Sequence, residues 1–87
     1  MIHVAIVDDH SIVRAGLQAV FSPASDIRVV GSFPDARSFF GAVSRMDRLD
    51  VVLLDVSMPG TDGFDVIRRL NERREPPRVV LLSMHPA

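Results

Sequence analysis

The chain has 87 residues, 47% of them hydrophobic and 24% charged, and its formal net charge at pH 7 is −1. This length suits one domain with a limited core, and the composition excludes the disordered and fibrous classes. The near-neutral charge predicts no strong attraction to nucleic acid or anionic membranes, and the lack of cysteine excludes disulfides and thiolate metal sites. No apolar run approaches the ~20 residues that cross a bilayer, so we expect a cytoplasmic protein without membrane contact.

Short apolar runs alternate along the chain with stretches of helical periodicity. The runs are rich in β-branched residues, which is typical of strands buried on both faces of a parallel sheet. Prolines and glycines separate these segments. In chain order we predict a strand over 2–7, a helix over 11–22, a strand over 27–30 ended by Gly31, a helix that opens at Pro34-Asp35, a strand over 51–54, a helix ending near Arg74 and a strand over 79–82.

This (βα)₃β pattern predicts an α/β fold with a parallel sheet and helices on both of its faces, because crossovers between parallel strands are right-handed. Each predicted helix has one apolar face that we expect to pack on the sheet. The expected core-facing residues are Val13, Leu17 and Val20 in the first helix, Phe39, Phe40 and Val43 in the second, and Phe64, Ile67 and Leu70 in the third.

Two of the predicted strands run directly into aspartate. Asp8 and Asp9 follow the first strand, and Asp55 follows the third. Ligands of open parallel sheets bind beyond the carboxyl ends of the strands, so these three carboxylates are expected to share one pocket. Such hard oxygen ligands suit Mg²⁺ and, through the metal, a phosphoryl group. A carboxylate can also attack phosphorus and form an aspartyl phosphate.

Other interpretations of the same residues are possible. Asp9 alone could cap the first helix, and Asp55 could be a solvated residue at a strand end. His10 and His85 could join the aspartates in a transition-metal site. We favour Mg²⁺ because the three carboxylates occur together, and because imidazole is not a ligand that a magnesium phosphoryl site needs.

Four segments resemble a known family. They are residues 7–10 (VDDH), 13–17 (VRAGL), 53–63 (LLDVSMPGTDG) and 81–85 (LLSMH). In content, order and spacing they resemble the receiver domain of bacterial response regulators, most closely the LuxR-type (NarL/FixJ) subgroup. The resemblance implies a flavodoxin-like (CheY-like) doubly wound parallel sheet, here shortened to (βα)₃β.

The resemblance also implies roles for individual residues. Asp55 would be the phosphoacceptor and a metal ligand. Asp9 would bind Mg²⁺ directly, Asp8 would bind it mainly through water, and the backbone carbonyl of Ser57 would complete the protein ligands. Ser83 would be the switch hydroxyl that moves to the phosphoryl group.

Ser57 and His85 would flank the phosphoryl group and influence its lifetime. The implied partner is a sensor histidine kinase, and the domain would catalyse its own phosphorylation and dephosphorylation without being a turnover enzyme. The implied output is transcription, through a DNA-binding domain that is not present in this chain.

The sequence departs from the family at its end. The family's domain continues with a helix, a strand ending in a lysine that contacts the phosphoryl group, and a last helix, whereas this chain ends at Ala87 and contains no lysine. We therefore expect a C-terminally truncated receiver domain over 1–87 whose strand 79–82 lies at an exposed edge and favours a dimer or an exchange of elements. The alternative function is a receiver-derived module that no longer switches and only dimerises or binds a partner.

Overall fold

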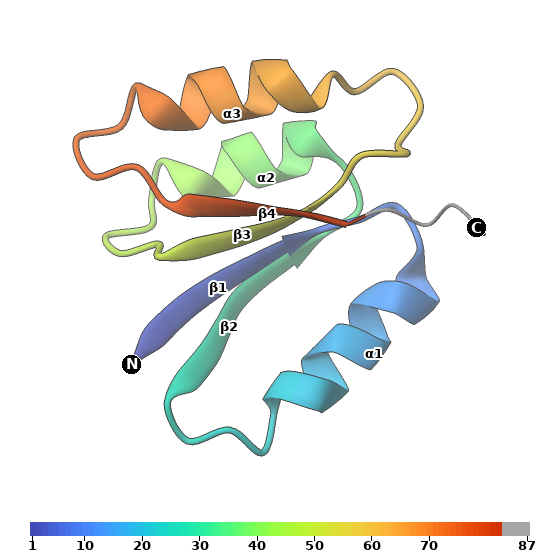
Figure 1. Ribbon diagram of the computed structural model, residues 1–87, viewed down its shortest axis with the longest axis vertical. Coiled ribbons are helices and arrows are strands. Elements are labelled where there is room, and N and C mark those ends of the chain that lie inside the picture. The colour runs from blue at the N-terminus through green and yellow to red at the C-terminus, as the bar shows by residue number, and fades with distance from the viewer. Residues whose placement is uncertain (83–87) are drawn as a thin grey trace.

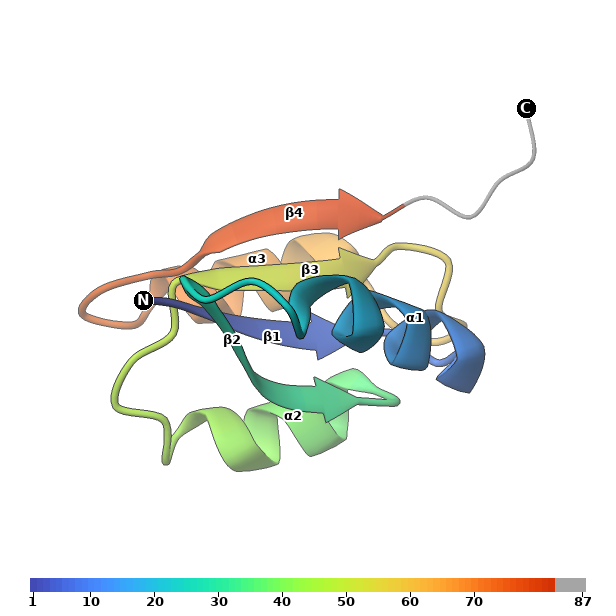
Figure 2. The same cartoon turned by 90° about the horizontal axis from the view of Figure 1, so that it is seen from below.

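The computed structural model describes residues 1–82, which form one four-stranded sheet and three helices. The strands are all parallel and lie in the order β2-β1-β3-β4. Helix α1 covers one face of the sheet, and α2 and α3 cover the other (Figures 1 and 2). The elements are β1 (Ile2–Val7), α1 (Ser11–Phe21), β2 (Ile27–Phe33), α2 (Ala36–Val43), β3 (Val51–Asp55), α3 (Gly63–Asn71) and β4 (Arg78–Leu82). The predicted flavodoxin-like order of a doubly wound sheet is confirmed.

The central strands β1 and β3 carry the core. Their last four residues are buried in each case, which explains why both runs are almost wholly apolar. The larger core cluster lies between the sheet and α2 and α3, where the Phe39 ring packs 5.6 Å from the Phe33 ring and 5.1 Å from the Phe40 ring, measured between centroids. The smaller cluster lies under α1 and centres on Ile6. The two strands that end in aspartate are thus held from both faces.

Aspartates begin two of the helices. The Asp35 carboxylate accepts a hydrogen bond of 2.7 Å from the Ser38 N–H and caps α2, and Asp62 accepts one of 2.9 Å from the Phe64 N–H and caps α3. Among residues 1–82, every helix is too short or too polar to span a bilayer.

Strand β2 continues beyond the glycine at which we predicted its end. Its pairing with β1 shifts by one residue between Val4 and Ala5, so that Val30 is bulged out and Gly31 resumes the ladder opposite Ala5. A Cβ atom at Gly31 would lie 2.5 Å from the Phe33 ring, so glycine permits this close packing. The predicted end of the strand was wrong because a bulge, and not a turn, uses the glycine.

The predicted core-facing residues of α2 are confirmed, but α1 and α3 each turn one of the predicted core-facing residues to solvent. In α1, Val20 is 68% exposed and Phe21 is packed against the core in its place. In α3, Phe64 is 82% exposed, whereas Val66 and Leu70 are buried. Phe64 lies about 200° around the helix from Val66, at about 100° a residue, so the two cannot share a face. Periodicity identified the apolar stripe but not which of its edges meets the sheet.

Candidate metal centre

The aspartates of β1 and β3 meet at the carboxyl edge of the sheet. Val7 of β1 pairs with Leu54 of β3, so Asp8 and Asp55, each one residue further on, are neighbours. Both are buried, with exposed fractions of 0% and 1%, whereas the Asp9 side chain is 36% exposed. These carboxylates and the His10 imidazole each offer a ligand atom, and all four atoms lie within 4.8 Å of one another. The predicted meeting of the three aspartates is confirmed.

One oxygen of each buried carboxylate is hydrogen-bonded and the other is not. Asp8 Oδ1 accepts from the His10 backbone N–H at 2.8 Å, and Asp55 Oδ1 accepts from the Ser57 N–H at 2.8 Å and the Ser57 hydroxyl at 2.6 Å. Oδ2 of Asp8 and Oδ2 of Asp55 have no hydrogen-bond partner among residues 1–82. A buried anionic oxygen without a partner is unfavourable, and a cation bound between the carboxylates would remove that cost. The donor set therefore fits a divalent ion with a preference for oxygen.

Hydrogen bonds lower the pKa of the Asp55 carboxyl. Burial pushes the pKa of this carboxyl upward, but the hydrogen bonds from the Ser57 hydroxyl and backbone outweigh it and leave the pKa below its usual value. The carboxylate is the form that can ligate a metal and attack phosphorus. The Ser57 side chain lies beside the predicted phosphoacceptor, and its role as a flanking residue stays a prediction.

Of the site residues that the structure describes, His10 is the one whose position was least predictable from the sequence. Its Nδ1 atom lies 2.9 Å from Asp8 Oδ1, 3.0 Å from Asp9 Oδ1 and 3.7 Å from Asp55 Oδ2. The hydrogen bond to Asp8 and the charge of Asp9 raise the pKa of His10. The signal available in the sequence was its spacing, because a residue two positions after a strand-end aspartate can turn back onto that carboxylate.

Two neighbouring features fix the loops of the site. The Arg14 guanidinium, from α1, donates a hydrogen bond of 2.6 Å to the Asp8 carbonyl. After β3, Gly60 adopts a positive φ of 73° in a turn closed by the Thr61 N–H and the Met58 carbonyl, as the Pro59-Gly60 pair predicts.

Asp9 does not cap α1. The N-cap residue is His10, and no side chain accepts a capping hydrogen bond there. The Asp9 carboxylate instead faces the His10 ring. The capping alternative for Asp9 was therefore wrong. Ser83 and His85, the predicted switch hydroxyl and second flanking residue, lie outside the described residues.

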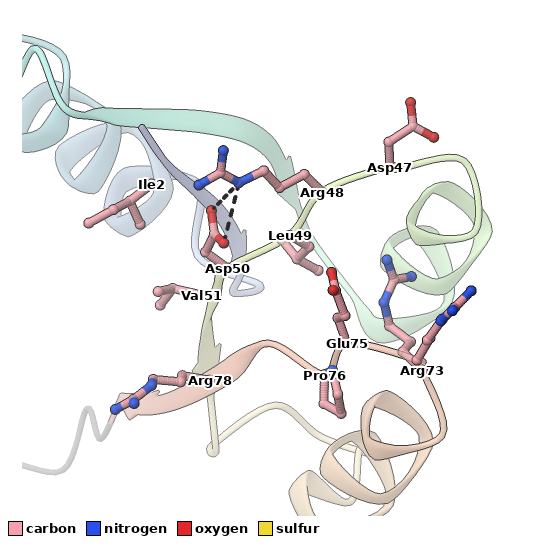
Figure 3. A pocket seen from close by; sticks show the side chains of 11 residues that line it. Ile2, Asp47, Arg48, Leu49, Asp50, Val51, Arg73, Glu75, Pro76 and Arg78 are labelled. Carbon is pink, nitrogen blue, oxygen red and sulfur yellow. Dashed lines mark hydrogen bonds and ion pairs between the residues drawn. The ribbon is translucent and has the colours of Figure 1, made fainter.

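A groove of about 1,050 Å³ lies at the opposite end of the sheet, where β3 and β4 begin (Figure 3). Its charged side chains are four arginines and three acidic residues, so their charges nearly cancel. The guanidinium of Arg48 donates to the Asp50 carboxylate at 3.1 Å, and Asp50 also accepts from the His3 backbone N–H at 2.7 Å. These contacts join the start of β3 to β1 and indicate a structural role. The charged lining residues are Asp47, Arg48, Asp50, Arg73, Arg74, Glu75 and Arg78.

Comparison with known proteins agrees with this geometry. The family model described as "Response regulator receiver domain" matches residues 4–87. Response regulator UvrY of Escherichia coli (strain K12) is 37% identical over 87 residues, which cover 98% of this chain and 38% of UvrY. The chain thus spans well under half the length of this relative.

Solved structures of isolated domains are similar in fold. The REC domain of RcsB from Salmonella enterica serovar Typhimurium, solved with the phosphomimetic BeF₃⁻, superposes with a TM-score of 0.84 at 28% identity, covering 99% of this chain and 64% of that one. The signal receiver domain of the putative response regulator NarL from Mycobacterium tuberculosis gives a TM-score of 0.80 at 33% identity, covering 99% of this chain and 68% of that one.

Proposed function

Because the chain belongs to the response regulator receiver domain family, with relatives of the LuxR (NarL/FixJ) type, we propose that it is the phosphoacceptor of a two-component system. In this proposal a sensor histidine kinase or a small acyl phosphate donates a phosphoryl group to Asp55. The observation that carries it is the environment of Asp55, which is 1% exposed, accepts two hydrogen bonds from Ser57 and lies beside two further carboxylates. The alternative, a receiver-derived module that no longer switches and only dimerises or binds a partner, is less favoured because all three carboxylates are in place.

The reaction forms a bond between a carboxylate oxygen of Asp55 and phosphorus and breaks the bond between phosphorus and the donor's leaving group. The two hydrogen bonds from Ser57 fix the orientation of the carboxylate before attack. Asp8, Asp9, Asp55 and the backbone carbonyl of Ser57 would hold Mg²⁺. When bound, Mg²⁺ offsets the negative charge that three carboxylates and a phosphoryl group bring together.

The roles of Ser83 and His85 stay predictions, as does the transcriptional output. Because the chain spans 38% of UvrY, we propose only that DNA binding, where it occurs, belongs to a domain other than the one described. The chain would regulate its own phosphorylation and would not turn over a substrate.

The test is phosphorylation by acetyl phosphate, followed by intact mass. We expect the protein to gain one phosphoryl group only when Mg²⁺ is present. Asp55→Asn should abolish the gain, because it removes the nucleophilic oxygen. Asp47→Asn is the matched control, since Asp47 is an exposed aspartate outside the cluster of Asp8, Asp9, His10 and Asp55. Modification that persists in Asp55→Asn would contradict the assignment.

Self-association through β4 also stays a prediction. Within residues 1–82, β4 lies at one edge of the sheet, and its side chains Val80 and Leu81 are 46% and 51% exposed. An apolar edge strand offers an unpaired ladder to a second copy. Sedimentation should show a dimer or larger species that Leu81→Lys dissociates, and a folded monomer at micromolar concentration would contradict this expectation.

A further inference from the structure

The metal centre contains one nitrogen donor among its oxygens. We infer that His10 is a fourth metal-ligating side chain of this centre, through Nδ1, and that it shifts the site's selectivity towards transition-metal dications that accept imidazole. This inference rests on the proposed function, in which the same aspartates hold Mg²⁺. It adds a ligand and a class of ion to that site.

The distances within the cluster match those between donors around one ion. An octahedral ion with bonds of about 2.1 Å places adjacent donors about 3.0 Å apart and opposite donors about 4.2 Å apart. His10 Nδ1 lies 2.9 Å from Asp8 Oδ1 and 3.0 Å from Asp9 Oδ1, close to the adjacent spacing. Its distance to Asp55 Oδ2, 3.7 Å, falls between the two values. The imidazole nitrogen is therefore spaced as an adjacent ligand relative to Asp8 and Asp9.

The buried oxygens give an independent reason for an ion at this place. Oδ2 of Asp8 and Oδ2 of Asp55 are buried and lack a partner among residues 1–82, and His10 does not supply one. A cation between these oxygens would satisfy both. The His10 side chain is 51% exposed and Asp9 36%, so the ion can enter from solvent on their side of the cluster.

The backbone holds the imidazole in position before any ion binds. The His10 N–H donates to Asp8 Oδ1 at 2.8 Å, and the His10 carbonyl accepts from the Arg14 N–H at 3.1 Å as the first bond of α1. The ring is thus attached to a residue fixed on both sides. A ligand held in this way loses little freedom when it binds a metal.

The type of donor atom determines which ions bind more tightly when His10 is a ligand. Mg²⁺ prefers carboxylate, carbonyl and water oxygens, so a nitrogen donor adds little to its affinity. Imidazole suits Ni²⁺, Zn²⁺ and their neighbours, which bind a given set of nitrogen and oxygen ligands more tightly than the earlier divalent metals. The predicted signature is a change in the Ni²⁺ to Mg²⁺ affinity ratio when His10 is replaced.

Calorimetric titrations of the untagged protein with Mg²⁺ and with Ni²⁺, at one pH, test the inference. His10→Asn retains an amide N–H that can donate to Asp8 and replaces the imidazole nitrogen by an amide oxygen, so it separates hydrogen bonding from ligation by nitrogen. We expect this variant to lose about tenfold or more in Ni²⁺ affinity and less than about threefold in Mg²⁺ affinity. His3→Asn, which removes an imidazole on β1 outside the cluster, is the control and should leave both affinities unchanged.

The outcomes separate this inference from the proposed function. In one outcome, Mg²⁺ binds the wild type, Asp9→Asn lowers the Mg²⁺ affinity, and the Ni²⁺ affinity is the same in the wild type and in His10→Asn. In that case only the role of His10 is wrong. A rise in both affinities in His10→Asn would also overturn it, since His10 would then compete with the ion. If neither ion binds the wild type, the metal centre itself and this inference fail together. In the positive case, the ¹⁵N shift of one His10 ring nitrogen should move on addition of Zn²⁺ and remain unmoved by Mg²⁺.

Discussion

Magnesium should stabilise the folded chain, and the effect should depend on Asp9. Oδ2 of Asp8 and Oδ2 of Asp55 are buried without a partner among the described residues, and such groups cost about 1–3 kcal/mol each. The ion-free fold therefore carries an unfavourable term of roughly 2–6 kcal/mol at this site. An ion that binds only the folded state can relieve that term.

The expected size follows from mass action. At a free Mg²⁺ concentration ten times the dissociation constant, binding raises the free energy of unfolding by RT ln(1 + [L]/Kd), or about 1.4 kcal/mol. This is less than the free-energy cost of burying the two unpartnered oxygens. The entropy of unfolding is about 2.1 cal/mol/K per residue, or about 0.18 kcal/mol/K for a chain of 87 residues. The melting temperature should then rise by about 8 °C.

Thermal unfolding followed by circular dichroism, with and without Mg²⁺ at constant ionic strength, measures this rise. Asp9→Asn removes one ligand and should shrink the rise, while the ion-free form of the variant should melt no lower than the ion-free wild type, because one like charge has gone. Asp47→Asn should respond as the wild type does. An equal rise in wild type and Asp9→Asn would refute the reasoning, since the ion would then act nonspecifically.

Four further substitutions test the fold. Phe39→Ala should lower the free energy of unfolding by about 3–5 kcal/mol in urea titrations, whereas Phe64→Ala, at an 82% exposed residue, should change it by no more than about 0.5 kcal/mol. The φ of 73° at Gly60 should make Gly60→Ala cost about 1–2 kcal/mol in the same assay. Hydrogen bonds from Ser38 lower the pKa of Asp35, so its stabilising effect is present above the unfolded-state value and is lost as pH falls through the folded one. Asp35→Asn should therefore weaken the dependence of the melting temperature on pH below about pH 4, and an unchanged dependence would contradict this.

The sequence alone was sufficient to predict the sheet and the acidic part of the site. A sheet with one solvent-exposed face would show alternating apolar and polar residues in its strands. Residues 2–7 and 51–54 lack that alternation, which identifies them as central strands of a parallel sheet. Parallel strands end at a common edge, so the positions of Asp8 and Asp55 followed from topology without any knowledge of side-chain contacts.

The parts that the sequence did not predict depend on local geometry and helix orientation. The return of the His10 ring onto the aspartates is a matter of backbone angles over two residues. The choice between Val20 and Phe21 in α1, and the exposure of Phe64 in α3, depend on how each helix crosses the sheet. The bulge at Gly31 depends on packing against the Phe33 ring. The helix orientations and the bulge have no periodicity that a sequence pattern could detect.

Helix α1 contains no fully buried residue, although it directly follows residues 8–10, which carry two of the aspartates and His10. Amide hydrogens should therefore exchange at different rates in the two parts of the molecule. Those of α1 should exchange through local opening, and the buried amides of β1 and β3 only through global unfolding. Arg14 of α1 holds the Asp8 carbonyl, so each local opening of the helix also releases the backbone of a proposed metal ligand. An ion bound to Asp8 would oppose that release. Metal binding should then slow amide exchange along α1, a helix that donates no side chain of its own to the ion.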